Sequence, residues 1–333
     1  MNYKQILSEI ETKNFAPVYF LMGEESYYID QISNFLAKTV LKKEEQEFNQ
    51  VVFYGDDSTT DQIINECKQF PFGSTKRLVI VKEGQNLKQI ELLDAYINNP
   101  QKSTVLVICY KKKSIDKRKK FGKNLVKKCI VFESKKLYEN EIYDWIINYM
   151  HEKRINIDNN ATALISESIG TDLSKLTNEL DKLIILIKNN ETITAELVEQ
   201  HIGISKDYNI FELQNALAKR NSLKANKIIN YFAANPKNYN IIPVISSLFL
   251  FFQKVMIYHF IKHKNIYDIS KALKINHYFV KQYQTASNHY NKYQLFNIIK
   301  YLKEYDLKSK GINNQNTSNS DLLKELILKI LYT

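Results

Sequence analysis

The sequence has few cysteines and no long apolar run, and both shortages limit what kind of protein it encodes. Its three cysteines, Cys67, Cys109 and Cys129, are far apart and odd in number. We therefore expect buried or free thiols in a reducing cytoplasm rather than a set of disulfides. No apolar run approaches the roughly 20 residues that a bilayer-spanning helix needs. The N-terminal segment also lacks the pattern of a secretion signal, so the sequence predicts a cytoplasmic chain without membrane contact.

Positive charge is concentrated in one part of the chain. The formal net charge is +11, and residues 102–136 alone contain thirteen Lys or Arg against two acids. Such a cluster binds a phosphate backbone or an acidic protein face, or it lies on a solvated loop. The residues that would contact DNA or an acidic partner are Lys111, Lys112, Lys113, Lys117, Arg118, Lys119 and Lys120.

Short apolar runs alternate with helical patterns in the first 135 residues. Helical patterns cover residues 27–41, 61–70 and 86–97. Because the apolar runs are nearly continuous, they are typical of strands that are covered on both faces. Strands that alternate with helices predict an α/β domain with a parallel sheet. The five predicted strands are residues 18–22, 50–54, 78–81, 105–110 and 129–132.

Beyond residue 138 the strand signal disappears and helical patterns continue to the end. One predicted helix begins at Asp158 or Asn159 and is stopped by Gly170, which can adopt a left-handed cap. The order of the parts suggests a nucleotide-handling module followed by its lid. We predict three domains: an α/β domain over residues 1–137, a small helical domain over 138–206 and an all-helical domain over 207–333.

A nucleotide-handling domain needs a phosphate loop after its first strand. The pattern GxxxxGK[ST] surrounds phosphates with backbone N–H groups and supplies a lysine. Here the first strand leads into Gly23, Glu24, Glu25 and Ser26, and the second glycine and the lysine are missing. Two glutamates would also repel phosphate. The sequence therefore predicts a degenerate loop, no bound cofactor and no ATP hydrolysis.

Other catalytic and binding patterns are also missing. His259 and His263 stand four residues apart on a predicted helix, but no third ligand of the HExxH kind accompanies them. No GxSxG nucleophile elbow occurs. Residues 265–284 resemble a helix–turn–helix, yet Tyr278 and Tyr283 on its second helix favour packing over base readout. We predict neither intrinsic catalysis nor a metal site.

One turn contains residues that its position does not explain. The segment QFPFGSTKR places Phe70, Pro71 and Phe72 just before a strand, whereas turns usually contain Gly, Pro, Asn, Asp or Ser. Because Pro71 disfavours helical geometry at the preceding residue, the helix should end near Phe70, on its apolar stripe. Phe70 is then expected either in the core or at an interface. Phe72 lies off the stripe and is expected to reach outward as an interface anchor.

Five segments, in order, resemble one family, the delta subunits of bacterial DNA polymerase III clamp loaders. The resemblance spans nearly the whole chain. The segments are PVYFLMGEESYYID at residues 17–30, FPFGSTKRLVIVKEG at 70–84, IGTDLSKLTNELDKL at 169–183, IFELQNALAKRN at 210–221, and EYDLKSKG with LLKELILKIL within 304–331.

The resemblance implies an AAA+-like (RecA-type) domain with a degenerate phosphate loop, a helical lid and a helical collar that joins subunits. It implies a non-catalytic subunit that binds the sliding clamp (the beta subunit) through Phe70, Pro71 and Phe72. Such subunits help to open the clamp for loading onto primed DNA. The implied partners are the clamp, the ATP-binding and delta-prime loader subunits, and primer-template DNA. Two other hypotheses remain: a stand-alone basic DNA-binding protein and an active AAA+ ATPase.

Overall fold

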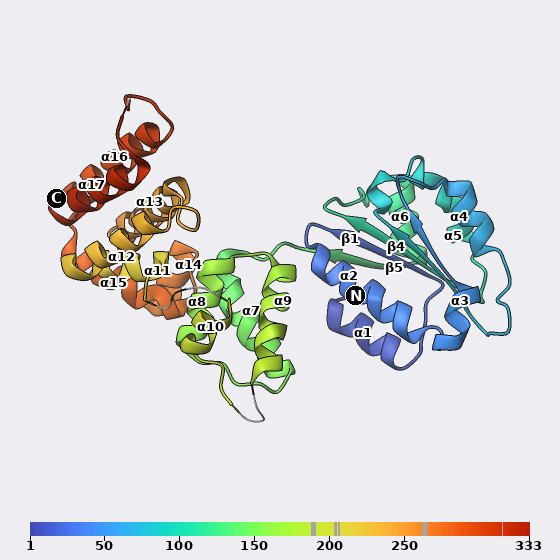
Figure 1. Cartoon of the computed structure of the whole chain (residues 1–333). Coiled ribbons are helices and arrows are strands. Elements are labelled where there is room, and N and C mark those ends of the chain that lie inside the picture. Colours follow the sequence, from blue (N-terminus) through green and yellow to red (C-terminus); the bar gives the residue numbers. More distant parts are fainter. Residues whose placement is uncertain (188–190, 203–204, 206, 262–264, 315) are drawn as a thin grey trace. The chain divides into compact units, whose positions relative to one another are not determined.

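The computed structural model describes residues 1–187, 191–202, 205, 207–261, 265–314 and 316–333. The chain forms two compact units, Met1–Leu137 and Tyr138–Thr333 (Figure 1). The first unit contains both strands and helices. Its strands are β1 Val18–Gly23, β2 Gln50–Tyr54, β3 Arg77–Lys82, β4 Thr104–Lys111 and β5 Ile130–Ser134. Its α-helices are α1 Tyr3–Glu11, α2 Ser26–Thr39, α3 Gln46–Asn49, α4 Thr60–Cys67, α5 Asp94–Asn98 and α6 Lys120–Lys128.

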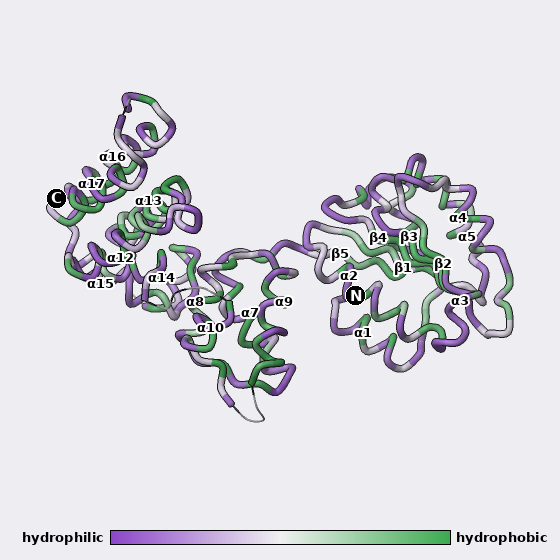
Figure 2. Tube along the Cα trace, viewed as in Figure 1, coloured by the Kyte–Doolittle hydropathy of each residue, from purple (hydrophilic) through white to green (hydrophobic). Residues whose placement is uncertain are grey.

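The five strands form one parallel sheet in the order β2-β3-β4-β1-β5. Helices cover both faces: α4, α5 and α6 pack on one face, and α1 and α2 pack on the other (Figure 1). The strands between these layers are predominantly hydrophobic (Figure 2), as strands shielded on both faces must be. The expected α/β domain with a parallel sheet is confirmed, and its AAA+-like character stays a prediction.

Two predicted helices of this unit differ from those observed. The helix expected over residues 61–70 is α4, which already ends at Cys67. The helix expected over residues 86–97 consists of the 3₁₀ turns η2 (Gly84–Asn86) and η3 (Ile90–Leu93), followed by the short α5. Gln89 is left-handed, with φ 54°, and a left-handed residue interrupts the run of α-helical hydrogen bonds.

The three cysteines are free thiols, as the sequence predicts. Cys67 and Cys109 are buried in the two cores beside the sheet, and Cys129 is half-buried. Burial disfavours the thiolate and raises the pKa of Cys109 to about 11. The thiols of this unit are therefore protonated at neutral pH, with the character of small apolar side chains.

The second unit is built from helices. They are α7 Glu139–Glu152, α8 Asn159–Ile169, α9 Leu173–Leu186, α10 Ala195–Ile202, α11 Ile210–Ala218, α12 Ser222–Ala234, α13 Ile241–Tyr258, α14 Ile266–Leu273, the 3₁₀ turn η4 His277–Phe279, α15 Val280–His289, α16 Lys292–Ser309 and α17 Asn319–Leu331. The predicted helix at residue 159 is α8. Asp158 caps it, and Gly170 ends it with φ 73°.

A single apolar core joins α11 to α17. In the region described as a candidate helix–turn–helix, Val280 and Tyr283 are buried in this core, so packing is confirmed there. Tyr278 stacks on Tyr143 of α7 with ring centroids 4.9 Å apart. The division of this unit into a lid (138–206) and a collar (207–333) stays a prediction.

Helix α13 is 18 residues long, and by length and composition alone it could cross a membrane. Its buried side chains pack within the core of the second unit, which is typical of the central helix of a folded domain. They are Ile241, Val244, Ile245, Leu248, Phe251, Phe252, Val255 and Tyr258.

Candidate functional site

The carboxyl end of β1 is where a phosphate loop would lie, and the chain closes this position itself. β1 ends at Gly23 and α2 begins at Ser26, so only Glu24 and Glu25 connect them. A phosphate loop needs a longer turn whose backbone N–H groups point at the ligand. The N–H groups of Gly23 and Glu24 donate instead to backbone carbonyls of neighbouring segments, at 3.0 and 3.2 Å.

The amino end of α2 already holds an anion. Glu25 is the N-cap of this helix, and its Oε1 accepts a hydrogen bond from the N–H of Tyr27 at 3.0 Å. Free N–H groups and the helix dipole attract phosphate to such a position. Here the Glu25 carboxylate takes that place, and the exposed Glu24 adds a second negative charge. Both the length of the connection and its charge oppose binding of a nucleotide phosphate.

Gly23 looks like the first glycine of a phosphate loop, but its geometry gives it a different role. Its φ is 125°, and a Cβ atom built on it would lie 2.1 Å from the carbonyl oxygen of Ser134. The strands β1 and β5 can therefore approach this closely only because residue 23 is glycine.

The turn after α4 carries its aromatic side chains into solvent. Phe72 is 73% exposed, as expected, and Phe70 is 78% exposed. The alternative that placed Phe70 in the core is wrong, because α4 ends at Cys67 and Phe70 therefore does not continue its apolar stripe. Gly73 is left-handed with φ 61° and reverses the chain toward β3. We call residues 70–73 the aromatic tip.

Two buried polar side chains, neither of them predicted from the sequence, fix the base of the aromatic tip. Asn49 is fully buried; its Nδ2 donates to the Phe72 carbonyl at 2.9 Å, and its Oδ1 accepts from the Phe72 N–H at 2.7 Å. Arg77 pairs with Glu66 of α4 and donates to Gln69 Oε1 at 3.1 Å. The tip is therefore tied to the ends of α3, α4 and β3.

Phe48 was also missed by the sequence analysis, although it lies beside the aromatic tip. It is 59% exposed, and its ring centroid lies 5.7 Å from that of Phe72. The Phe48 carbonyl accepts a hydrogen bond from Arg77 Nη1 at 3.3 Å. In the sequence, Phe48 is visible only as a single aromatic residue just before the predicted strand at residue 50. No local sequence pattern indicates that it lies near Phe72.

The aromatic tip and the phosphate-loop position lie at opposite ends of the parallel strands. The tip is at the amino ends, and the phosphate-loop position is at the carboxyl ends, called here the carboxyl edge. β2 and β3 are parallel and pair from Gln50 with Leu78, so Asn49 and Arg77 stand at the amino ends of these strands. Gly23 ends β1 and therefore stands at the carboxyl edge. Ligands of open α/β sheets bind at the carboxyl edge. The tip is thus a separate surface feature and not part of a nucleotide crevice.

The basic segment lies at the carboxyl edge and over α6. The Lys113 carbonyl accepts the N–H of Gly23, so the segment crosses the end of β1. Three of the seven predicted contact residues pair with acids: Lys111 with Asp30 at 2.6 Å, Lys117 with Glu133 at 2.5 Å and Arg118 with Asp116 at 3.0 Å. Within the described part of the chain, the other four are exposed and form no ion pair: Lys112, Lys113, Lys119 and Lys120. Their contact with DNA or an acidic partner stays a prediction.

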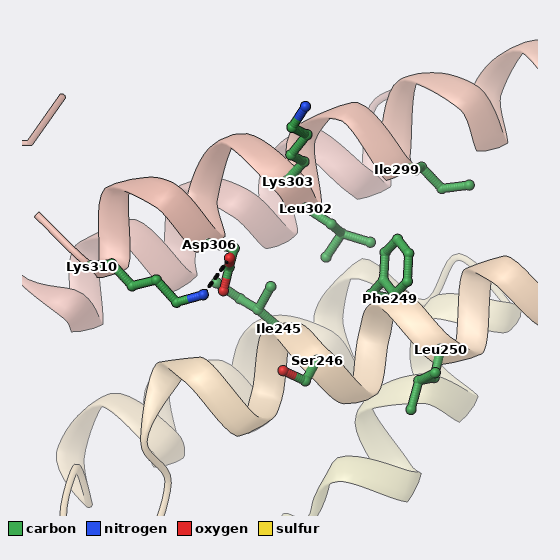
Figure 3. A pocket seen from close by; sticks show the side chains of 9 residues that line it. All are labelled: Ile245, Ser246, Phe249, Leu250, Ile299, Leu302, Lys303, Asp306 and Lys310. Carbon is green, nitrogen blue, oxygen red and sulfur yellow. Dashed lines mark hydrogen bonds and ion pairs between the residues drawn. The ribbon is translucent and has the colours of Figure 1, made fainter. Parts of the chain in front are cut away.

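A second apolar feature lies on the helical unit. Helices α13 and α16 border a groove of about 570 Å³. Figure 3 shows Phe249 and Leu250 on α13 and Ile299 and Leu302 on α16 lining it, with Lys310 and Asp306 at one end. Lys310 Nζ lies 2.7 Å from the Asp306 carboxylate. An open groove with apolar walls is a typical place for a partner's side chain.

Of the two histidines that stand four residues apart, the structure describes only His259. His259 Nε2 lies 2.8 Å from the carbonyl oxygen of Tyr290. His263 lies outside the described residues. Among the described residues, no group of three or more His, Cys, Asp and Glu side chains is placed to hold a metal ion.

Known proteins resemble the chain over nearly its whole length. It is 28% identical over 323 residues to the DNA polymerase III subunit delta of Bacillus subtilis (strain 168), covering 94% of this chain and 92% of that protein. It is 25% identical over 315 residues to the probable DNA polymerase III subunit delta of Aquifex aeolicus (strain VF5), covering 88% and 86%. The solved structure of the Bacillus subtilis DNA clamp loader delta protein matches with a TM-score of 0.59 and 25% identity, covering 99% of this chain and 100% of that one.

Two family models match separate parts of the chain. The model described as DNA polymerase III, delta subunit matches residues 19–135, which contain the sheet and the aromatic tip. The model described as DNA polymerase III delta subunit, C-terminal domain matches residues 207–329. The two matches together cover more than half of the sequence, and the chain belongs to the family of DNA polymerase III delta subunits.

Proposed function

We propose that this clamp-loader delta subunit binds the sliding clamp through its aromatic tip and helps to open it, without hydrolysing ATP itself. The observation that carries the proposal is the pair of exposed rings, Phe70 and Phe72, on a turn that buried side chains hold in place. Exposed aromatic residues on a fixed support are typical anchors of protein interfaces. Burying one such ring stabilises a complex by roughly 1.5–3 kcal/mol.

Opening of a closed ring needs no chemistry in this subunit. A ligand shifts an equilibrium by the difference between its affinities for the two states. The tip therefore has only to bind the open or distorted clamp more tightly than the closed one. ATP is bound and hydrolysed by partner subunits, and their conformational changes expose and withdraw the tip.

The closed phosphate-loop position supports a role without ATP hydrolysis. The connection has two residues and no lysine, and the N–H groups of Gly23, Glu24 and Tyr27 already donate to acceptors of the chain itself. This geometry argues against the hypothesis of an active AAA+ ATPase. No catalytic residue and no resident cofactor are assigned to the chain, which acts in the cytoplasm with the rest of the replication machinery.

The direct test is binding of the purified full chain to the purified sliding clamp. We expect saturable binding in surface plasmon resonance that neither requires nor responds to ATP, and no saturable ATP binding by the chain alone in calorimetry. Tight ATP binding would favour an active ATPase. DNA binding that weakens steeply with salt, combined with no clamp binding, would favour the second candidate, a stand-alone DNA-binding protein that uses its unpaired lysines.

The helical unit is proposed to join the other loader subunits, both ATP-binding and delta-prime. Its groove between α13 and α16 has apolar walls that a partner subunit's apolar side chains would fill. Primer-template DNA within the assembly is the proposed partner of the exposed basic residues of the first unit.

Leu250→Asp tests the role of the groove. Leu250 is exposed at the groove wall, and an aspartate there would place an unpaired charge in a buried contact. We expect at least about a tenfold loss of affinity for the other loader subunits, because a lost apolar contact of this size is worth roughly 1.5 kcal/mol or more. Size-exclusion chromatography of the mixed subunits measures this loss, and clamp binding by the variant should remain unchanged.

Ile185→Asp is the matched control for the groove. Ile185 is an exposed apolar residue of α9 in the same unit and does not line the groove. Normal assembly of Leu250→Asp, or equal defects in both variants, would count against the groove as the contact surface.

A further inference from the structure

The backbone of Phe72 is held by a side chain that is distant in the sequence. Asn49 lies 23 positions earlier, at the end of α3, and bonds both the N–H and the C=O of Phe72. Its Nδ2 also donates to the Glu45 carbonyl at 3.1 Å. An amide group has two N–H donors and an acceptor oxygen, and both kinds are used here. Asn49 thus links α3 to the turn by bonding both backbone groups of Phe72, much as a neighbouring strand bonds the N–H and the C=O of one residue.

This arrangement fixes one residue of a turn that lies outside the regular secondary structure. Residues 68–76 belong to no helix or strand. A buried side-chain amide is costly unless it is fully hydrogen-bonded, so the three bonds strongly favour a single conformation at Phe72. A residue held in one conformation loses less conformational entropy when it binds a partner.

The same support presents another aromatic ring next to Phe72. Phe48 precedes Asn49, is largely exposed, and its ring meets that of Phe72 at an interplanar angle of 55°. Arg77 is buried and holds the Phe48 carbonyl with Nη1, while its Nη2 binds Glu66 and Gln69. Phe48 and Phe72 therefore form one apolar surface although they belong to different segments.

We propose that Phe48 is a further contact residue of the clamp-binding surface, and that Asn49 is the positioning residue that sets the conformation of Phe72. This inference rests on the proposed clamp-binding function. The surface then consists of the aromatic tip together with Phe48, and its geometry depends on a hydrogen-bonded residue that does not touch the clamp.

Phe48→Ala in the full chain tests the contact role. We expect about a tenfold loss of affinity for the purified sliding clamp, because an exposed aromatic contact residue is removed. Tyr54→Ala is the matched control: Tyr54 is an exposed aromatic residue at the other end of β2 and should leave the affinity unchanged. Wild-type affinity of Phe48→Ala would overturn the assignment of Phe48.

A double-mutant cycle tests the positioning role of Asn49. Asn49→Ala should weaken clamp binding about tenfold in the wild-type background, and should have almost no effect once Phe72→Ala is present, since residues that act through one another are non-additive. A general folding defect would weaken binding equally in both backgrounds, and that result would overturn the positioning role. Asn49→Asp offers a second variant of nearly the same shape, which keeps the acceptor but lacks the N–H donors.

Hydrogen exchange provides a readout that needs no clamp. The Phe72 amide should exchange slowly in the wild-type chain and rapidly in Asn49→Ala, because its acceptor is removed. A fast-exchanging Phe72 amide in the wild-type chain would overturn the proposed fixation. If Phe72→Ala weakens clamp binding while the Phe48 and Asn49 variants bind normally, this inference fails and the proposed function stands. If the wild-type chain does not bind the clamp, both fail.

Discussion

Replacing Phe72 and Pro71 together by alanine is expected to weaken binding to the sliding clamp about 30-fold or more, which corresponds to about 2 kcal/mol. The Phe72 ring is 73% exposed in the free chain. In the proposed complex it would become buried only on binding, so its removal would be a loss of interface energy. Pro71 restricts Phe70 and the start of the turn, and its replacement also loosens the aromatic tip. Surface plasmon resonance with immobilised clamp measures the change.

The variant should fold as the wild type does, because the Phe72 ring is mostly in solvent and the Pro71 ring is only partly buried. Far-UV circular dichroism and the thermal midpoint check this directly. Leu92→Ala is the matched control, since Leu92 is an exposed apolar residue of the same unit in η3, outside the aromatic tip. If the double variant binds the clamp with unchanged affinity, the aromatic tip is not part of the interface, whatever the control shows.

The exposure of Phe72 could be predicted from the sequence because its cause is local. A proline ends the helical pattern, a glycine reverses the chain, and an apolar strand follows. The end of α4 was predicted three residues too late, since the pre-proline rule gives the last allowed helical position and not the actual one. Phe70 was therefore counted on an apolar stripe that the helix does not reach.

The support of the tip could not be predicted, because its partners are brought together only by the sheet. Asn49 bonds Phe72 across 23 residues, and Arg77 bonds Phe48 across 29. These pairs depend on β2 lying beside β3, and the strand order is not contained in any local pattern. The same limit applies to the groove of the second unit, whose walls come from α13 and α16.

The phosphate-loop position shows a third reason why the sequence alone predicts only part of the structure. The missing lysine and second glycine were visible in the sequence, and the short connection between β1 and α2 agrees with their loss. The reason for the remaining glycine was not visible. The positive φ of residue 23 and the close approach of Ser134, more than 100 residues later, explain why position 23 carries no side chain.

Gly23→Ala is accordingly expected to destabilise the first unit by about 2–6 kcal/mol, with nucleotide binding playing no part. A positive φ of this kind costs a residue with a side chain about 1–3 kcal/mol. Its Cβ would also meet backbone atoms of Ser134 at 2.1 and 2.6 Å, and overpacking of this sort costs about as much again. Urea unfolding followed by circular dichroism measures the loss, and hydrogen exchange in β1 and β5 peptides localises it.

Gly73→Ala separates the two causes. Gly73 also has a positive φ, 61°, but no atom lies within 4 Å of the position that a Cβ would occupy. Its replacement should therefore cost only the backbone strain, about 1 kcal/mol. Equal losses in the two variants would show that φ alone matters at residue 23. A stable Gly23→Ala chain would mean that β1 and β5 can separate at this point, and the glycine would then need another explanation.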